Sequence, residues 1–128
     1  MGHQFRKHYT RDEARALLPE IRQWLEQLAH SREQLTKLDH RLGQRFAQGC
    51  DVGGDTANDW VRLFCAMKQL LHEFYQREIQ VKDLDRGLID FPALIGGREV
   101  FLCWEKDEED IEYWHDLDTG YAGREPLT

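Results

Sequence analysis

The residues best suited to chemistry are carboxylates gathered around the single histidine in the last third of the chain. Asp83 and Asp85 flank one leucine, so their side chains share one side of an extended segment. Asp90 and His115 fall in later segments that we expect to be strands, and Asp118 follows closely. Carboxylates and an imidazole bind hard or intermediate divalent ions such as magnesium, manganese or zinc. These five residues therefore form a candidate metal site.

A metal held there would activate water for hydrolysis, and Arg86 and Arg124 would clamp an anionic substrate. This interpretation is a divalent-metal-dependent hydrolase or a small-anion-binding protein. The chain contains no P-loop and no G-x-S-x-G sequence. The sequence therefore leaves open whether the protein is an enzyme.

A structural interpretation explains the same residues, and we favour it. Asp83 to Gly87 has the composition of a turn in which aspartates accept from backbone amides and Gly87 takes a positive φ. Arg124 would pair with Asp118 or another acid of the tail. In this interpretation there is no cofactor.

An antiparallel hairpin must position Asp90 and His115. Gly96-Gly97 is a two-residue turn signal between segments 88–95 and 98–105, and a third strand is expected at 111–115. In this register one face carries only apolar side chains, which we expect to pack on the helices: Ile89, Phe91, Ala93, Val100, Leu102 and Trp104. The opposite face includes Asp90 and Cys103, and also His115 if Trp114 lies beside Leu102. We expect this mixed face to be partly solvated.

Two long helices precede the sheet. Thr10 and Glu13 have the spacing of a capping box, and an apolar stripe then predicts a helix over 10–47. A glycine-rich break at 48–55 separates it from a second helix over 56–78. Apolar residues at intervals of three and four predict a core or dimer stripe, represented by Leu28, Leu35, Leu38, Leu42, Phe64 and Leu71.

The first helix is longer than the second, so part of its stripe needs another partner. A second copy of the chain would supply one by forming a four-helix bundle. We therefore predict a homodimer and a non-enzymatic role as a self-associating binding or scaffold module, with a different protein partner as an alternative.

The predicted fold is a single α+β domain over 1–128. A long antiparallel helical hairpin packs on a small three-stranded antiparallel sheet, and the sheet and an ordered C-terminal tail occupy 81–128.

Composition limits the function classes. Residues 82–128 carry thirteen acidic and five basic side chains, a net charge of −8 that disfavours nucleic acid as a partner. The longest strongly apolar runs are about five residues, whereas a membrane span needs roughly twenty. The chain opens without a charged-then-apolar leader, and its three cysteines contain no C-x-x-C pair. We therefore expect a cytoplasmic protein with reduced thiols, in which Cys65 and Cys103 serve as small buried hydrophobes.

Three segments carry a family resemblance: YTRDEARALLPEIR (residues 9–22), VKDLDRGLIDFPALIGGREVFLCW (81–104) and YWHDLDTGYAGREPL (113–127). They resemble the bacterial and archaeal family catalogued as domain of unknown function 2203. The resemblance covers nearly the whole chain except the glycine-rich break. It implies a small cytoplasmic protein of unestablished activity, and some members of that family carry a label relating them to division-initiation proteins.

Overall fold

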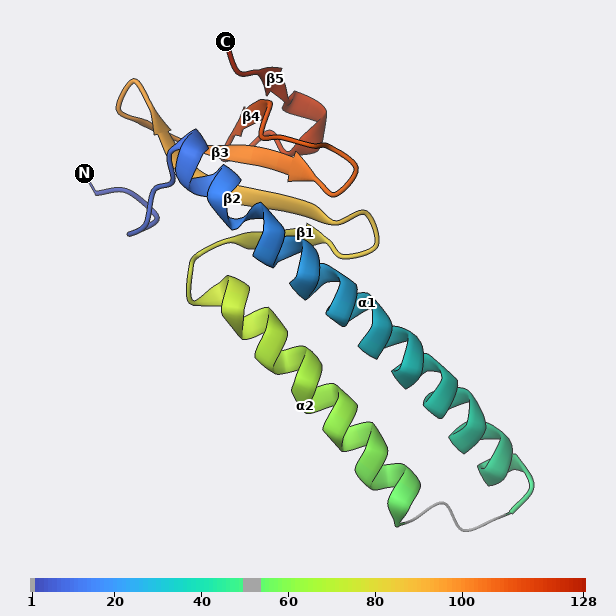
Figure 1. Cartoon of the computed structure of the whole chain (residues 1–128). Coiled ribbons are helices and arrows are strands. Elements are labelled where there is room, and N and C mark those ends of the chain that lie inside the picture. Colours follow the sequence, from blue (N-terminus) through green and yellow to red (C-terminus); the bar gives the residue numbers. More distant parts are fainter. Residues whose placement is uncertain (1, 50–53) are drawn as a thin grey trace. The chain divides into compact units, whose positions relative to one another are not determined.

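The computed structural model describes residues 2–49 and 54–128 and shows an α+β protein (Figure 1). Two helices, α1 (Arg11–Ala47) and α2 (Asp55–Tyr75), precede an antiparallel sheet. The predicted fold class is confirmed, and the helices begin and end within three residues of the predicted bounds. Residues 50–53, the centre of the glycine-rich break, lie outside the described part of the chain, and Cys50 is among them.

The sheet has five strands, so the prediction of three was wrong. The strands lie in chain order: β1 (Gln80–Asp83), β2 (Leu88–Ile95), β3 (Arg98–Glu105), β4 (Tyr113–Asp116) and β5 (Glu125–Pro126). The two that sequence periodicity missed are β1, whose pairing shifts between Val81 and Asp83, and β5, which is two residues long and contains a proline. The irregular pairing of β1 and the shortness of β5 hide an alternating pattern.

The predicted registers are confirmed. β2 pairs with β3 so that Ile89 lies opposite Trp104 and Ile95 opposite Arg98. Gly96 and Gly97 both have positive φ, at 59° and 77°, as a type I′ turn requires. β3 pairs with β4 through Leu102 and Trp114, which places His115 on the same face as Cys103.

Both faces of the sheet are buried at its centre. The apolar face is buried as predicted, and so are α1 residues Ala14, Leu18 and Ile21. The expectation that the mixed face is partly solvated was wrong, because Asp90, Phe101, Cys103 and His115 on that face are also buried. The N-terminal segment contributes to this cover, since the ring of Phe5 meets that of Phe101 edge to face at 5.4 Å.

The described chain divides into two compact units. The sheet unit comprises Met1–Gln23 and Glu73–Thr128, and the helical unit comprises Trp24–His72. In the sheet unit, the predicted capping box starts α1: the Thr10 amide donates to Glu13 Oε1 (2.9 Å) and the Glu13 amide donates to Thr10 Oγ1 (3.1 Å). In the helical unit, Trp60 Nε1 donates to Asp39 Oδ1 at 2.7 Å.

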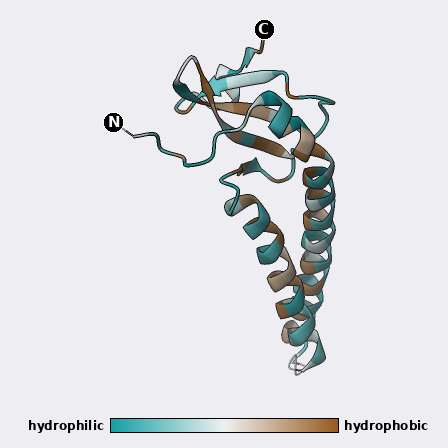
Figure 2. Ribbon diagram, turned by 60° about the vertical axis from the view of Figure 1, so that its left-hand side comes forward, coloured by the Kyte–Doolittle hydropathy of each residue, from teal (hydrophilic) through white to brown (hydrophobic). Residues whose placement is uncertain are grey.

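Hydrophobic and hydrophilic residues are interspersed along both helices (Figure 2). No helix in the described ranges combines the length and the apolar character that crossing a membrane requires.

Candidate functional sites in the sheet and on the helices

Three neighbouring strands bring one carboxylate, one thiol and one imidazole together. Asp90 on β2 lies directly opposite Cys103 on β3, and His115 on β4 lies opposite Phe101, two residues along from Cys103. Side chains two residues apart point to the same face of a sheet. One ligand atom from each of the three side chains lies within 4.8 Å of the other two.

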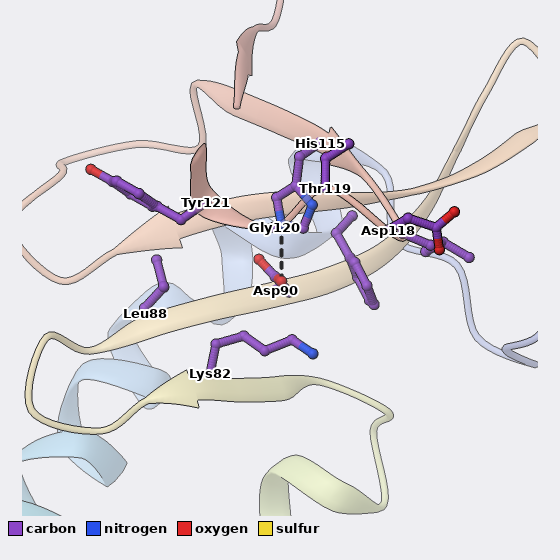
Figure 3. Close-up of a pocket in the computed structure, with 10 residues that line it drawn as sticks. Lys82, Leu88, Asp90, His115, Asp118, Thr119, Gly120 and Tyr121 are labelled. Carbon is purple, nitrogen blue, oxygen red and sulfur yellow. Dashed lines mark hydrogen bonds and ion pairs between the residues drawn. The ribbon is translucent and has the colours of Figure 1, made fainter. Parts of the chain in front are cut away.

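The hydrogen bonds of His115 define its tautomer. Its Nδ1 lies 2.7 Å from the carbonyl oxygen of Asp116, which can only accept, so Nδ1 carries a proton. Its Nε2 lies 3.0 Å from Asp90 Oδ2 (Figure 3), so the imidazole and the carboxylate form a buried hydrogen-bonded pair. The remaining carboxylate oxygen, Asp90 Oδ1, is buried and has no hydrogen-bond partner among the described residues.

Cys103 belongs to this cluster, and we had not predicted it. The register places Cys103 opposite Asp90 and on the face of His115, so the signal was present, but we read the residue only as a small hydrophobe. Burial, and after it the charge of Asp90, raise the pKa of the Cys103 thiol to about 12. The free thiol is therefore protonated at neutral pH and is a poor nucleophile. Cys65, by contrast, is exposed, so the expectation that it is buried was wrong.

A pocket of about 290 Å³ opens beside Asp90 and His115. Its rim carries Lys82, Asp118 and Tyr121 (Figure 3), so charges of both signs and an aromatic ring border it. Both nitrogens of His115 are hydrogen-bonded within the protein. The pocket is therefore suited to holding a small ligand, but no free imidazole nitrogen faces it as a base.

The other two predicted metal ligands lie elsewhere. Asp83 ends β1, and its Oδ1 accepts from the Arg86 amide at 3.2 Å. Asp85 is exposed in the turn that follows, and neither carboxylate lines the pocket. Gly87 in this turn has a φ of 64°, as the structural interpretation predicted, and its amide donates to the Leu84 carbonyl.

Arg86 and Arg124 hold the C-terminal tail in place. Arg86 pairs with Glu105 at 2.6 Å, and this hydrogen-bonded contact raises the pKa of Arg86 above its ordinary value. Arg124 pairs with Glu108, which corrects the expectation of a partner in the tail. Both guanidinium groups lie over the ring of Tyr121, at 4.2 and 4.7 Å from its centre. Each arginine thus already has a carboxylate partner, which favours a structural role over clamping an anion.

The predicted apolar stripe is buried only in part. Leu28 and Leu38 are buried, whereas Leu35 and Leu42 are half-buried. Phe64 and Leu71 on α2 remain 42% and 40% exposed. The stripe is therefore a core near the start of the helical unit and an open apolar surface along α2.

The chain belongs to the family described as an uncharacterized conserved protein, DUF2203, whose model matches residues 7–127. This match confirms the resemblance carried by the three segments quoted above. Neither the search of curated proteins nor the search of solved structures found a match.

Proposed function

We propose that this protein is a non-enzymatic, cytoplasmic module that self-associates into a homodimer through its helical unit and serves as a scaffold or binding partner. One observation carries the proposal. Over residues 29–49 and 54–72, Leu38 is the only buried side chain. Helices in water depend on packing of their apolar faces for most of their stability, so a hairpin this open requires further cover.

The uncovered apolar surface follows one face of α2. Val61, Phe64 and Leu71 on this face are between 40% and 53% exposed. A separate set on α2 is half-buried and faces about a quarter of a turn away: Trp60, Leu63, Met67 and Leu70. A helix with apolar residues on two adjoining faces needs more than one neighbour.

A second copy of α2 matches this face. In an antiparallel pair with its two-fold axis level with Ala66, Val61 of one copy lies opposite Leu71 of the other. Phe64 lies opposite Lys68, and the Lys68 ammonium already sits 5.7 Å from the Phe64 ring within one chain. The two-fold pairing thus joins an apolar residue to an apolar residue and a cation to an aromatic ring.

The charge of α2 also favours a second copy of the chain as the partner of this face. Over residues 55–72, α2 has two aspartates, one arginine and one lysine, so two copies meet without a net charge between them. The net charge of −8 lies in residues 82–128, outside the proposed interface. The acidic residues that would repel one another between two protomers therefore lie outside the helical face.

Sedimentation equilibrium of the full chain tests this proposal with a matched pair of variants. Val61→Glu places a charge opposite the apolar Leu71 of the other copy, whereas Gln69→Glu places the same charge on an exposed position outside both apolar faces. Placing a charge at a desolvated contact costs more than about 1.4 kcal/mol per copy, so Val61→Glu should weaken dimerisation by more than tenfold. Gln69→Glu should behave as the wild type.

Two results would contradict self-association through this face. One is a wild-type chain that stays monomeric at high micromolar concentration. The other is a Val61→Glu variant that dimerises as tightly as Gln69→Glu.

The pocket in the sheet supports a second candidate function, small-ligand or metal-dependent chemistry that uses Asp90, His115 and Asp118. The observation that favours it is the 290 Å³ pocket bordered by these three residues. A thermal-shift series with magnesium, manganese and zinc tests this candidate, since a bound ion raises the melting temperature. No shift with any of the three ions would refute the metal-dependent form of this candidate.

A further inference from the structure

We propose that Asp90, Cys103 and His115 form a zinc site, with one coordination position open to the neighbouring pocket. The three side chains come from adjacent strands, and their ligand atoms lie within 4.8 Å of one another. All three residues are at least 98% buried. The site is independent of the helical face through which we propose the protein self-associates.

His115 is already arranged as a metal ligand. A histidine that binds a metal through one nitrogen almost always donates its other N–H to a carbonyl or carboxylate, which fixes the ring. Nδ1 of His115 makes this bond to the Asp116 carbonyl at 2.7 Å. Nε2 is therefore directed at the cluster, 3.0 Å from Asp90 Oδ2.

Asp90 supplies an independent indication of a missing ligand. Its Oδ1 is buried and has no hydrogen-bond partner among the described residues, although nearly all buried polar atoms in folded proteins have one. The Cys103 thiol beside Asp90 is at most a weak donor to this carboxylate. A cation between the carboxylate, the thiolate and the imidazole would satisfy it.

The mixture of donors selects the metal. Magnesium and calcium take oxygen ligands almost alone, whereas one sulfur, one nitrogen and one oxygen suit zinc or a similar late transition metal. Zinc sites with three protein ligands keep a fourth position for water or a ligand. Because Asp90 and His115 border the pocket, that fourth position faces it.

A second group of ligands must be separated from this one in any experiment. His3, His8 and Glu99 also bring their ligand atoms within 4.8 Å of one another, but His3 is exposed and the group has no sulfur. Sulfur ligation therefore distinguishes the two groups. The chain has three cysteines, so a Cys50→Ser/Cys65→Ser protein retains Cys103 as its only thiol.

The test is cobalt substitution of the full, tag-free chain in this Cys50→Ser/Cys65→Ser background, after removal of bound metal with a chelator. A tetrahedral cobalt–thiolate site gives a sulfur-to-cobalt charge-transfer band in the near ultraviolet. We expect this band to appear with one cobalt ion per chain and to disappear when one equivalent of zinc is added. His3→Gln should leave it unchanged.

Cys103→Ala should abolish the band, and Asp90→Asn or His115→Gln should weaken zinc binding by more than tenfold in a chelator competition. Circular dichroism of each metal-free variant checks that it folds. The proposal is overturned if the folded Cys103-only protein shows no charge-transfer band with excess cobalt. It is also overturned if His3→Gln, rather than Cys103→Ala, removes zinc binding.

Discussion

The hydrogen bond between Asp90 and His115 predicts that Asp90→Asn and Asp90→Ala destabilise the protein to different extents. Because Nδ1 carries a proton, a neutral His115 presents Nε2 as an acceptor. The amide of Asp90→Asn can donate to that nitrogen across the same 3.0 Å, so most of the interaction survives. Asp90→Ala leaves Nε2 buried without a partner. Breaking a buried pair costs about 3 kcal/mol, whereas exchanging one hydrogen bond for another costs about 1 kcal/mol.

Urea unfolding followed by circular dichroism, in chelator and at pH 7, measures both values. Asp107→Asn is the matched control, because it removes the same charge from an exposed position, and it should change the free energy of unfolding by less than about 0.5 kcal/mol. Equal destabilisation by Asp90→Asn and Asp90→Ala would refute the argument, since it would mean that Asp90 acts through its charge and not as a hydrogen-bond partner.

Two further predictions concern the sheet unit. Burial alone would raise the pKa of Glu99, but hydrogen bonds from His8 and two backbone amides outweigh it and lower the pKa to about 2. Because the folded value lies below the ordinary 4.5, this stabilisation is complete above pH 4.5 and is lost as the pH falls towards 2. We expect Glu99→Gln to be about 1 kcal/mol less stable than the wild type at pH 6, after allowing for solvent screening. Unfolding measured from pH 6 to pH 2.5 should show this difference in the free energy of unfolding shrinking in acid. A difference that stays constant over this range would count against the hydrogen bonds of Glu99 as its cause. Gly87→Ala should lower the melting temperature, because φ is 64° and the new Cβ would lie 2.7 Å from the Lys106 Cβ. Gly43→Ala, in the open on α1, should raise it or leave it unchanged, and the opposite order would contradict the steric argument.

Local rules accounted for much of the fold. The Thr10–Glu13 capping box and the Gly96-Gly97 turn are short-range signals, and the hairpin turn then determines the register of β2 and β3. The alternation of side chains between the two faces of the sheet then predicted the pairing of β3 with β4, and so the face on which His115 lies. These features depend on residues that are close in the sequence or directly paired.

Long-range cover was not predictable in the same way. The mixed face of the sheet is buried partly because Phe5, nearly a hundred residues before Phe101, packs on it. No periodicity in β3 shows that an N-terminal segment will return to cover it. The error about solvation then hid the chemistry, because a thiol on a solvated face is ordinary, whereas a buried thiol between a carboxylate and an imidazole is a candidate ligand.

The charged residues that first indicated a metal site divide between two roles. Arg86 and Arg124 come from two of the segments that carry the family resemblance, and both stack on Tyr121 at the rim of the pocket. Their contacts with Tyr121, together with the ion pair between Arg124 and Glu108, hold the tail beside the pocket, which neither arginine lines. Asp90 and His115, from the same two segments, lie at its inner wall.

The two proposals are separable because they use different residues in different compact units. A charge at Val61 alters the helical face and leaves the ligands on β2, β3 and β4 intact, so Val61→Glu should keep the cobalt charge-transfer band. Cys103→Ala removes a ligand from the sheet and leaves α2 unchanged, so it should keep the dimer. A variant of one site that abolished both properties would mean that self-association and metal binding are coupled, and the independence of the two sites would then have to be abandoned.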